Sequence, residues 1–241
     1  MLKNLWFRLL GSALWITIIG WANLFGQDVG TTHVIPIVAD GAVGNGTIYI
    51  SSFLVTRRDK EPTNSCTLEA KGGLPANRIP ETFFDLTGKP AVQIFTNATG
   101  DLATGFAILS CTAPVSVNTL YVLTELATGP VSLTTVLSQG TFRKASLTAF
   151  HAPPITRLGL AIANSSSLPA IFTIQVEVAG TVLQANLTLP PQSSMSKFLD
   201  EILNVPNDFL IVHISSDIPI SATGLLYINN KFTTIPLTIV Q

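Results

Sequence analysis

Alternation of apolar and polar side chains is clearest in the second half of the chain, where it predicts β-strands. The stretch AIFTIQVEV (170–178) places an apolar residue at every second position, the period of a strand with one buried face. The dipeptide Ala179-Gly180 follows as a predicted turn, and VLQANLTL (182–189) completes a predicted hairpin. Further strands are predicted at 157–163 and 231–240.

A stretch near the end of the chain, FLIVHISSDIPISATGLLY (209–227), has a weaker copy 105 residues upstream. The segment SCTAPVS (110–116) aligns with SSDIPIS (215–221), so that serines, the proline and the apolar flanking positions correspond. Each copy is predicted to form an extended segment, a polar turn in which the proline interrupts pairing, and a second extended segment. The chain is therefore predicted to be all-β, with one β-sandwich module at 28–140 and a second at 141–241.

One short helix is predicted in the second module, from about Ser196 to Asn204. The apolar residues of this segment would share one helical face: Met195, Phe198, Leu199, Ile202 and Leu203. Because a two-turn helix is marginal on its own, we expect it to be docked on the sandwich.

In the first half, HVIPIVAD (33–40) and TIYISSFLVT (47–56) are predicted strands that flank the glycine-rich loop GAVGNG (41–46). A phosphate-binding loop would need a helix after it, whose N-terminal amides hold the anion. Because a β-branched and aromatic segment follows instead, we expect a hairpin turn that uses positive φ angles. The segment at 81–86 has room for a single helical turn, and 91–96 and 131–137 are predicted strands.

The first 27 residues have the pattern of an export segment. Lys3 and Arg8 precede an uncharged apolar run at 9–25, which fits either a cleaved signal peptide or a retained signal anchor. The sequence leaves both alternatives open. An anchor would place the positive charges on the cytoplasmic side, and its expected residues are Trp6, Arg8, Leu9, Leu14, Trp15, Ile18, Trp21 and Phe25. Under either alternative, the rest of the chain lies outside the cytoplasm.

Composition narrows the classes of partner. Charged residues are only 11% of the chain, against about a quarter in an average soluble protein. The net charge is −1, and no basic cluster exists beyond Arg57-Arg58. Nucleic acid is therefore excluded as an expected partner.

Two cysteines fit an exported protein. Cys66 and Cys111 both lie in the first module, 45 residues apart. A bridge between them would stabilise the fold by about 4 kcal/mol in the chain-entropy model, and the alternative is a pair of buried free thiols. Because exported proteins fold under oxidising conditions, we expect the disulfide.

The sequence shows no pattern typical of a catalytic or metal site. His33, His151 and His213 lack the close spacing of zinc ligands, and His213 alternates with apolar neighbours as a strand-face residue. No G-x-S-x-G motif is present, and the 14 acidic residues give no positive signal for a calcium or glycosidase site. We therefore expect no catalytic residues, no metal and no cofactor.

Several segments resemble a repeat found in exported bacterial proteins. They are HVIPIVADG, RLGLAIANSSSLPAIFTIQV, LTLPPQSSMSKFLDEIL, VHISSDIPISATGLLY and FTTIP, and together they cover nearly all of residues 31–241. The resemblance implies tandem β-sandwich modules on periplasmic or surface proteins and implies no established activity. The chain departs from this pattern in the cysteine pair and in the charged insertion at 57–64. We therefore expect a contact loop there, with Arg57, Arg58, Asp59 and Lys60.

The expected function is that of a non-catalytic structural or interaction protein. In the first hypothesis it is anchored on the periplasmic side of the bacterial inner membrane as an accessory subunit of a complex, for example a respiratory or photosynthetic assembly. The alternative is a secreted cell-surface or adhesin-like module that binds a glycan or a protein. A third hypothesis, an extracellular hydrolase, has no visible site in its favour.

Overall fold

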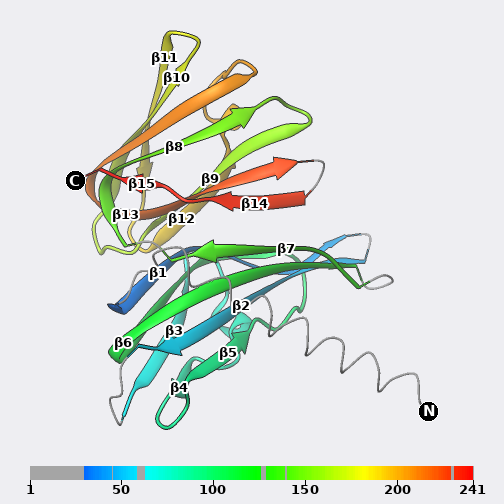
Figure 1. The fold of residues 1–241 in the computed structure, drawn as a ribbon, viewed down its shortest axis with the longest axis vertical. Coiled ribbons are helices and arrows are strands. Elements are labelled where there is room, and N and C mark those ends of the chain that lie inside the picture. Colours follow the sequence, from blue (N-terminus) through cyan, green and yellow to red (C-terminus); the bar gives the residue numbers. More distant parts are fainter. Residues whose placement is uncertain are drawn as a thin grey trace.

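A computed structural model describes residues 30–44, 46–58, 63–125, 129–138, 140–228 and 231–240. The predicted export segment at 1–27, with all of its expected anchor residues, lies outside this part of the chain, as do Asp59 and Lys60. The described part is all-β and consists of two sheets, which form the lower and upper lobes in Figure 1.

The first sheet has seven strands and is organised around one long strand. Its members are β1 (Gly30–Gly44), β2 (Thr47–Arg57), β3 (Ser65–Lys71), β4 (Phe83–Asp85), β5 (Ala91–Phe95), β6 (Ala103–Glu125) and β7 (Gly129–Leu137). The first half of β6 pairs with β1 and β3, and its second half pairs with β2 and β7. A 3-10 turn, η2 (Ala76–Arg78), lies between β3 and β4. The sheet therefore folds over itself in a sandwich-like manner along β6.

The second sheet has eight strands and repeats this arrangement. Its members are β8 (Phe142–His151), β9 (Thr156–Asn164), β10 (Ala170–Val178), β11 (Thr181–Leu189), β12 (Ser193–Phe198), β13 (Asp208–Ile228), β14 (Lys231–Ile235) and β15 (Thr238–Ile239). The first half of β13 pairs with β8 and β10, and its second half pairs with β9 and β14. The strands β8, β9, β10 and β13 thus take the places of β1, β2, β3 and β6.

The register of the ladders shows this correspondence residue by residue. On β6, Cys111 lies opposite Cys66 of β3, and 105 residues later Ser216 of β13 lies opposite Phe172 of β10. The two copies found in the sequence hold equivalent places in the two sheets.

The predicted polar turn inside each copy is wrong. β6 and β13 run through Pro114 and Pro219 as continuous strands. Each strand changes partners at this point: the β13–β8 register shifts between Ser215 and Ile220, and pairing with β9 begins at Ser221. A proline, which has no N–H to donate, is tolerated where the ladder is interrupted in this way.

The predicted helix from Ser196 to Asn204 is also wrong. Residues 193–198 form β12, which pairs with β9, and only the short 3-10 turn η3 (Leu199–Glu201) follows. Leu199 is the one residue of η3 that is buried in the core. Pairing with β9 satisfies the backbone of β12, whereas two helical turns would have had little intrinsic stability. In the first sheet the segment at 81–86 is not a helical turn either, because it contains β4.

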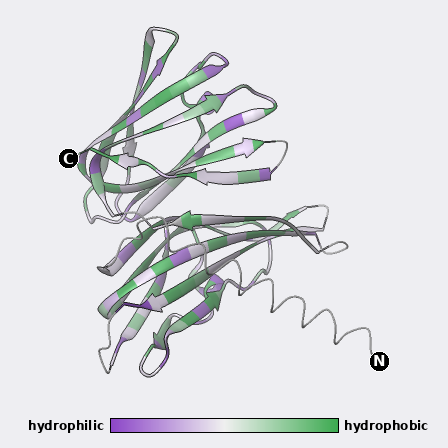
Figure 2. Cartoon of the chain, in the orientation of Figure 1, coloured by the Kyte–Doolittle hydropathy of each residue, from purple (hydrophilic) through white to green (hydrophobic). Residues whose placement is uncertain are grey.

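Alternating strands build one core for each sheet. On β10, Phe172, Ile174 and Val176 are almost completely buried between exposed or half-buried neighbours, as the alternation predicts. Figure 2 shows apolar residues along the strands of both lobes. The glycine-rich loop is the predicted hairpin turn, since Gly44 pairs with Thr47 and both Gly44 and Gly46 have positive φ.

The two sheets are packed against each other. Ile37, Ala39, Tyr121 and Val136 of the first sheet form an apolar cluster with Ala161 and Leu225 of the second. Hydrogen bonds cross the same junction, from Ser194 Oγ to Gly72 O (3.3 Å) and from Thr234 Oγ1 to Thr135 O (2.6 Å). In Figure 1, β7 lies on the side of the first sheet that faces β12 and β14.

Candidate binding surfaces

Four large apolar side chains form an exposed patch on the outer face of the second sheet. This apolar patch consists of Phe150 on β8, Val182 on β11, and Phe209 and Ile211 on β13. Phe150 and Phe209 are opposite each other in the ladder, with ring centroids 5.0 Å apart. Phe209 is 68% exposed because successive side chains of a strand point to opposite faces, and its neighbour Leu210 fills the core instead.

A shallow hollow of about 590 Å³ opens beside the patch. Its walls include Phe209, Ile211 and Val182, and the Ala179-Gly180 turn also lines it. Polar groups border it: Glu177 lines the hollow and lies 3.3 Å from His213 Nε2 on the same outer face. An apolar centre with a polar border is typical of surfaces that bind proteins.

The equivalent surface of the first sheet is covered. Because β6 and β13 correspond at an offset of 105 residues, Phe106 is the counterpart of Ile211. Phe106 is fully buried, in a cluster with Ala163 of the second sheet. In the first sheet, the residue that corresponds to Ile211 therefore contacts the second sheet.

The neighbouring strand β1, which pairs with β6, shows that the equivalent of Phe150 is also covered. Ala39 of β1 lies across the ladder from Thr104, as Phe150 of β8 lies across from Phe209. Ala39 belongs to the apolar cluster between the two sheets, which also contains Ala161. The apolar patch thus occupies the place that, in the first sheet, is used for docking.

All three tyrosines of the chain line a cleft of about 200 Å³ at the junction of the sheets. Tyr49, Tyr121 and Tyr227 come from β2, β6 and β13, and Phe232 of β14 lies among them. Ring centroids of Tyr227 and Phe232 are 5.4 Å apart in a stacked arrangement, and Tyr49 and Tyr121 lie about 6 Å from Phe232. The cleft therefore has aromatic walls contributed by both sheets.

Burial moves the pKa values of these phenols further above neutral pH. It raises the pKa of Tyr49, and it raises the pKa of Tyr121 well above its ordinary value. The pKa of Tyr227 is raised to about 12, mainly by burial and also by the nearby Tyr49. The hydroxyl of Tyr121 donates to the carbonyl of Ile37. At neutral pH the cleft offers hydrogen-bonding hydroxyls and aromatic surface, and no phenolate nucleophile.

A smaller hollow adjoins the cleft and shares Tyr227 with it. Lys197 and Phe198 line this hollow, and the guanidinium of Arg157 lies 3.6 Å from the centroid of the Phe198 ring. Asp200 accepts two hydrogen bonds from Arg157, at 2.8 and 3.1 Å. This border of the cleft is polar and rich in charge.

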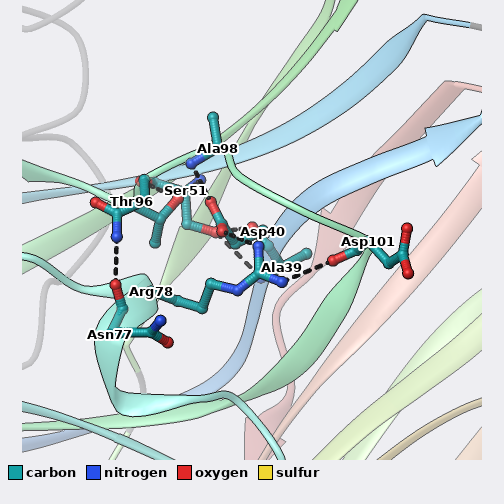
Figure 3. A network of polar contacts seen from close by, with 9 residues as sticks. Ala39, Asp40, Ser51, Asn77, Arg78, Thr96, Ala98 and Asp101 are labelled. Carbon is teal, nitrogen blue, oxygen red and sulfur yellow. Dashed lines mark hydrogen bonds and ion pairs between the residues drawn. The ribbon is translucent and has the colours of Figure 1, made fainter.

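A buried ion pair lies near the end of β1, and its contacts join neighbouring segments of the first sheet. Asp40 is fully buried, and Arg78 of η2 donates to its Oδ2 at 3.0 Å, while the N–H of Ala98 donates to Oδ1 at 2.8 Å. Arg78 also donates to the carbonyl of Asp101 (Figure 3). Both carboxylate oxygens are thus engaged in joining β1, η2 and the loop before β6. Gly41 permits this approach, because a Cβ there would lie 2.4 Å from the Asp101 carbonyl oxygen.

The predicted disulfide is confirmed. Cys66 and Cys111 are bridged between β3 and β6, with Cα atoms 4.1 Å apart. Within the predicted contact loop, Arg58 Nε donates to Ser116 Oγ at 3.0 Å, and Arg57 donates to the carbonyl of Leu86 at 3.5 Å. These two arginines lie against the first sheet, whereas the apolar patch is on the second.

The three histidines lie in separate places. His33 is buried, with Nε2 3.1 Å from the carbonyls of Gly30 and Val115. His151 is buried in β8 and accepts from the N–H of Leu158, whereas His213 is on the outer face of β13, as predicted for a strand-face residue. Among the described residues, no group of three or more His, Cys, Asp or Glu side chains is placed to hold a metal ion. In the same part of the chain, no helix has the length and apolar character needed to span a membrane.

Comparisons of the chain with protein-family models, with curated proteins and with solved structures gave no match. Function is therefore inferred from the surfaces themselves. The apolar patch was missed in the sequence, although FLIV (209–212) is apolar on both faces of its strand, which is a readable signal of a second contact surface. The tyrosine cleft has no such signal, because its residues come from distant strands.

Proposed function

We propose that this chain is a non-catalytic interaction protein that works outside the cytoplasm. In this proposal, residues 1–27 anchor it on the periplasmic side of a bacterial inner membrane, where it is an accessory subunit of a membrane complex. The observation that carries the proposal is the apolar patch around Phe209, whose counterpart in the first sheet is already a docking surface.

Energetics favour a covered patch. Each large apolar side chain that is removed from water contributes on the order of 1.5–3 kcal/mol. Phe150 and Phe209 are aromatic, and aromatic residues are enriched among the side chains that carry most of the binding energy at interfaces. A soluble protein gains nothing by leaving such a pair exposed, so a bound partner explains it.

The junction inside the chain indicates the chemistry of the partner. Phe106 packs with Ala163 of β9, and Ser221 of β13 donates to a carbonyl beside this cluster. Ala39 lies in a cluster with Ala161 of β9 and the larger Leu225 of β13. We infer that the patch binds a similar face, a β-sheet that presents small side chains together with aliphatic ones.

We also propose that the two sheets are tandem β-sandwich modules that arose by duplication of one unit, with a boundary near residue 140. The equivalent ladders of β6 and β13 support this proposal. If the modules are tandem copies, the apolar patch lies on the last module, at the place where a further module or a partner would dock.

The test is to change the patch in the full-length protein in its native membranes. Phe209→Asn is expected to release the protein from its complex, seen as loss of the high-mass band in native electrophoresis. Ile171→Asn is the matched control, because Ile171 is 57% exposed on the same sheet but outside the patch.

Retention of the complex by Phe209→Asn, or migration of the wild-type protein alone, contradicts the proposal. Mass spectrometry of the native N-terminus provides an independent check of the anchor, because a shortened, soluble chain would contradict membrane attachment while leaving the docking result intact.

A second candidate is a released module that binds a glycan in the tyrosine cleft. The stacked pair Tyr227–Phe232 and the neutral phenols favour it, since sugars bind to aromatic faces bordered by hydroxyl and charged groups. Binding on a glycan array that is lost in Tyr227→Ala and kept in Ile171→Asn would support this candidate. The absence of any bound glycan would exclude it.

A further inference from the structure

The strand β11 is an edge of the second sheet that has no covering element in the described part of the chain. The order of this sheet is β11-β10-β13-β8-β15, and among the strands that the structure describes β11 pairs with β10 alone. In Figure 1 the β10–β11 hairpin projects away from the first sheet. An edge strand presents unpaired N–H and C=O groups to which another strand can bind.

Among the edge strands in the described part of the chain, β11 is the longest one that lacks the features that prevent pairing. It is nine residues long, TVLQANLTL, with no charged residue, proline or glycine, and its register with β10 is unbroken. By contrast, β4 has three residues, β5 has five and β15 has two, while β12 and β14 carry Lys197 and Lys231. The strand β7 is as long as β11, but it begins with Gly129-Pro130 and its register with β6 shifts. Short strands, charges, prolines and bulges are the usual protections of an edge.

The hairpin geometry shows which backbone groups are free. The two-residue turn Ala179-Gly180 has positive φ at both positions, 47° and 75°, and it joins Val178 to Thr181. In such a turn the flanking residues exchange both hydrogen bonds, and hydrogen-bonded pairs then alternate along the ladder. Odd-numbered residues of β11 therefore bond to β10. The N–H and C=O groups of Val182, Gln184, Asn186 and Thr188 point to the open edge.

The sequence of β11 is complementary to itself about Ala185. In an antiparallel pair of two copies centred there, Gln184 lies opposite Asn186, and Val182 lies opposite Thr188. All four edge residues of each copy then sit in hydrogen-bonded pairs, so every free N–H and C=O finds a partner. No other two-fold register uses all of them.

The side chains agree with this register. Leu183 and Leu187, which pack partly against the core, would lie opposite each other on the core side of the new ladder. Gln184 and Asn186 would pair amide with amide on the outer side. The small residue Ala185 falls on the axis, where two side chains approach most closely.

We propose that two copies of this chain associate through β11 in an antiparallel, two-fold symmetric pair, which makes one continuous sheet across the dimer. A two-fold axis perpendicular to the sheet keeps the two outer faces on the same side. The apolar patches of both copies would therefore face the same way.

Disulfide trapping in the purified full-length protein tests this register. The native cysteines are bridged, so an introduced cysteine is the only free thiol. Ala185→Cys is expected to give a covalent dimer on mild oxidation, because only this position faces itself. Thr181→Cys is the matched control at the end of the same strand, and it should give no covalent dimer because residue 181 would face Leu189 and not its own copy.

Gln184→Pro removes a central edge N–H without removing a bond to β10, and Gln184→Lys places two like charges near the axis. Sedimentation should show a dimer for the wild-type protein and a monomer for both variants, with unchanged circular dichroism. Gln184→Lys, an exposed surface substitution, keeps the test valid if the proline variant does not fold. A wild-type monomer at high protein concentration, equal cross-linking by both cysteine variants, or a dimer that persists in Gln184→Lys would each overturn the proposal.

Discussion

Removal of the disulfide is expected to destabilise the first sheet by a predictable amount. The bridge between Cys66 and Cys111 closes a loop of 45 residues, which contains most of β3, all of β4 and β5, and the start of β6. For a loop of this length the chain-entropy model gives a stabilisation of about 4 kcal/mol. We therefore expect Cys66→Ala/Cys111→Ala to lose roughly this much free energy of unfolding.

The second sheet shows that the fold itself does not need the bridge. Phe172 and Ser216 hold the positions that correspond to the two cysteines, and the ladder between β10 and β13 is continuous there. The strands of the double variant should therefore still pair, and the loss should reflect the freedom gained by the unfolded chain. If the two sheets unfold in separate transitions, only that of the first sheet should move.

Urea unfolding followed by circular dichroism measures this loss, and reduction of the wild-type protein is the control. Reduction opens the same loop without removing side-chain atoms, so it should give the same loss as the double variant. A loss below about 1 kcal/mol in both would refute the reasoning, because it would mean that the unfolded chain already holds the two ends together. A large loss in the double variant but not on reduction would assign the effect to packing.

Three further predictions concern buried groups. Gly41→Ala should destabilise the protein by at least about 2 kcal/mol, because its Cβ would meet backbone atoms, whereas Gly44→Ala, which also has positive φ but open space around it, should cost less in the same urea assay. Arg78→Met should cost about 3–5 kcal/mol, since it leaves the buried carboxylate of Asp40 without its cation; a loss below about 1 kcal/mol would contradict this. Burial lowers the pKa of His151, so the unfolded chain takes up a proton that the folded chain does not, and stability should fall as the pH drops from about 7.5 to 5. This pH dependence should be weaker in His151→Asn, and an unchanged slope would contradict the assignment.

Much of the fold could be predicted because strand signals are local. The alternation in 170–178 depends only on neighbouring residues, and the burial of Phe172, Ile174 and Val176 follows it. The repeat was also readable, since it compares the chain with itself. The disulfide could be expected from the compartment, although its placement between adjacent strands of one sheet could not.

The errors occurred where a pattern fits two structures. The segment 195–203 has a helical period, yet Met195 pairs with Ile162 on β9, because a vacant sheet edge was available to it. A proline between two extended segments indicates a turn, yet Pro219 marks a change of partners within one strand. Such outcomes depend on tertiary pairing, which no local window contains.

The differences between the two copies indicate where the molecule is specialised. The place of β11 in the first sheet is taken by β4, which has only three residues, so the fold does not require a long uncharged edge. Likewise, Phe209 corresponds to Thr104, so an aromatic residue at this position is not needed for the ladder. The first copy instead carries a disulfide and a buried ion pair, which stabilise it internally. The second copy carries the long open edge and the exposed pair Phe150–Phe209, and both features lie on the layer of β8, β10, β11 and β13. The exposed aromatics of the first copy, Phe83 and Phe95, lie on the short edge strands β4 and β5. This division is what we expect if the first copy supports the structure and the second copy makes the contacts.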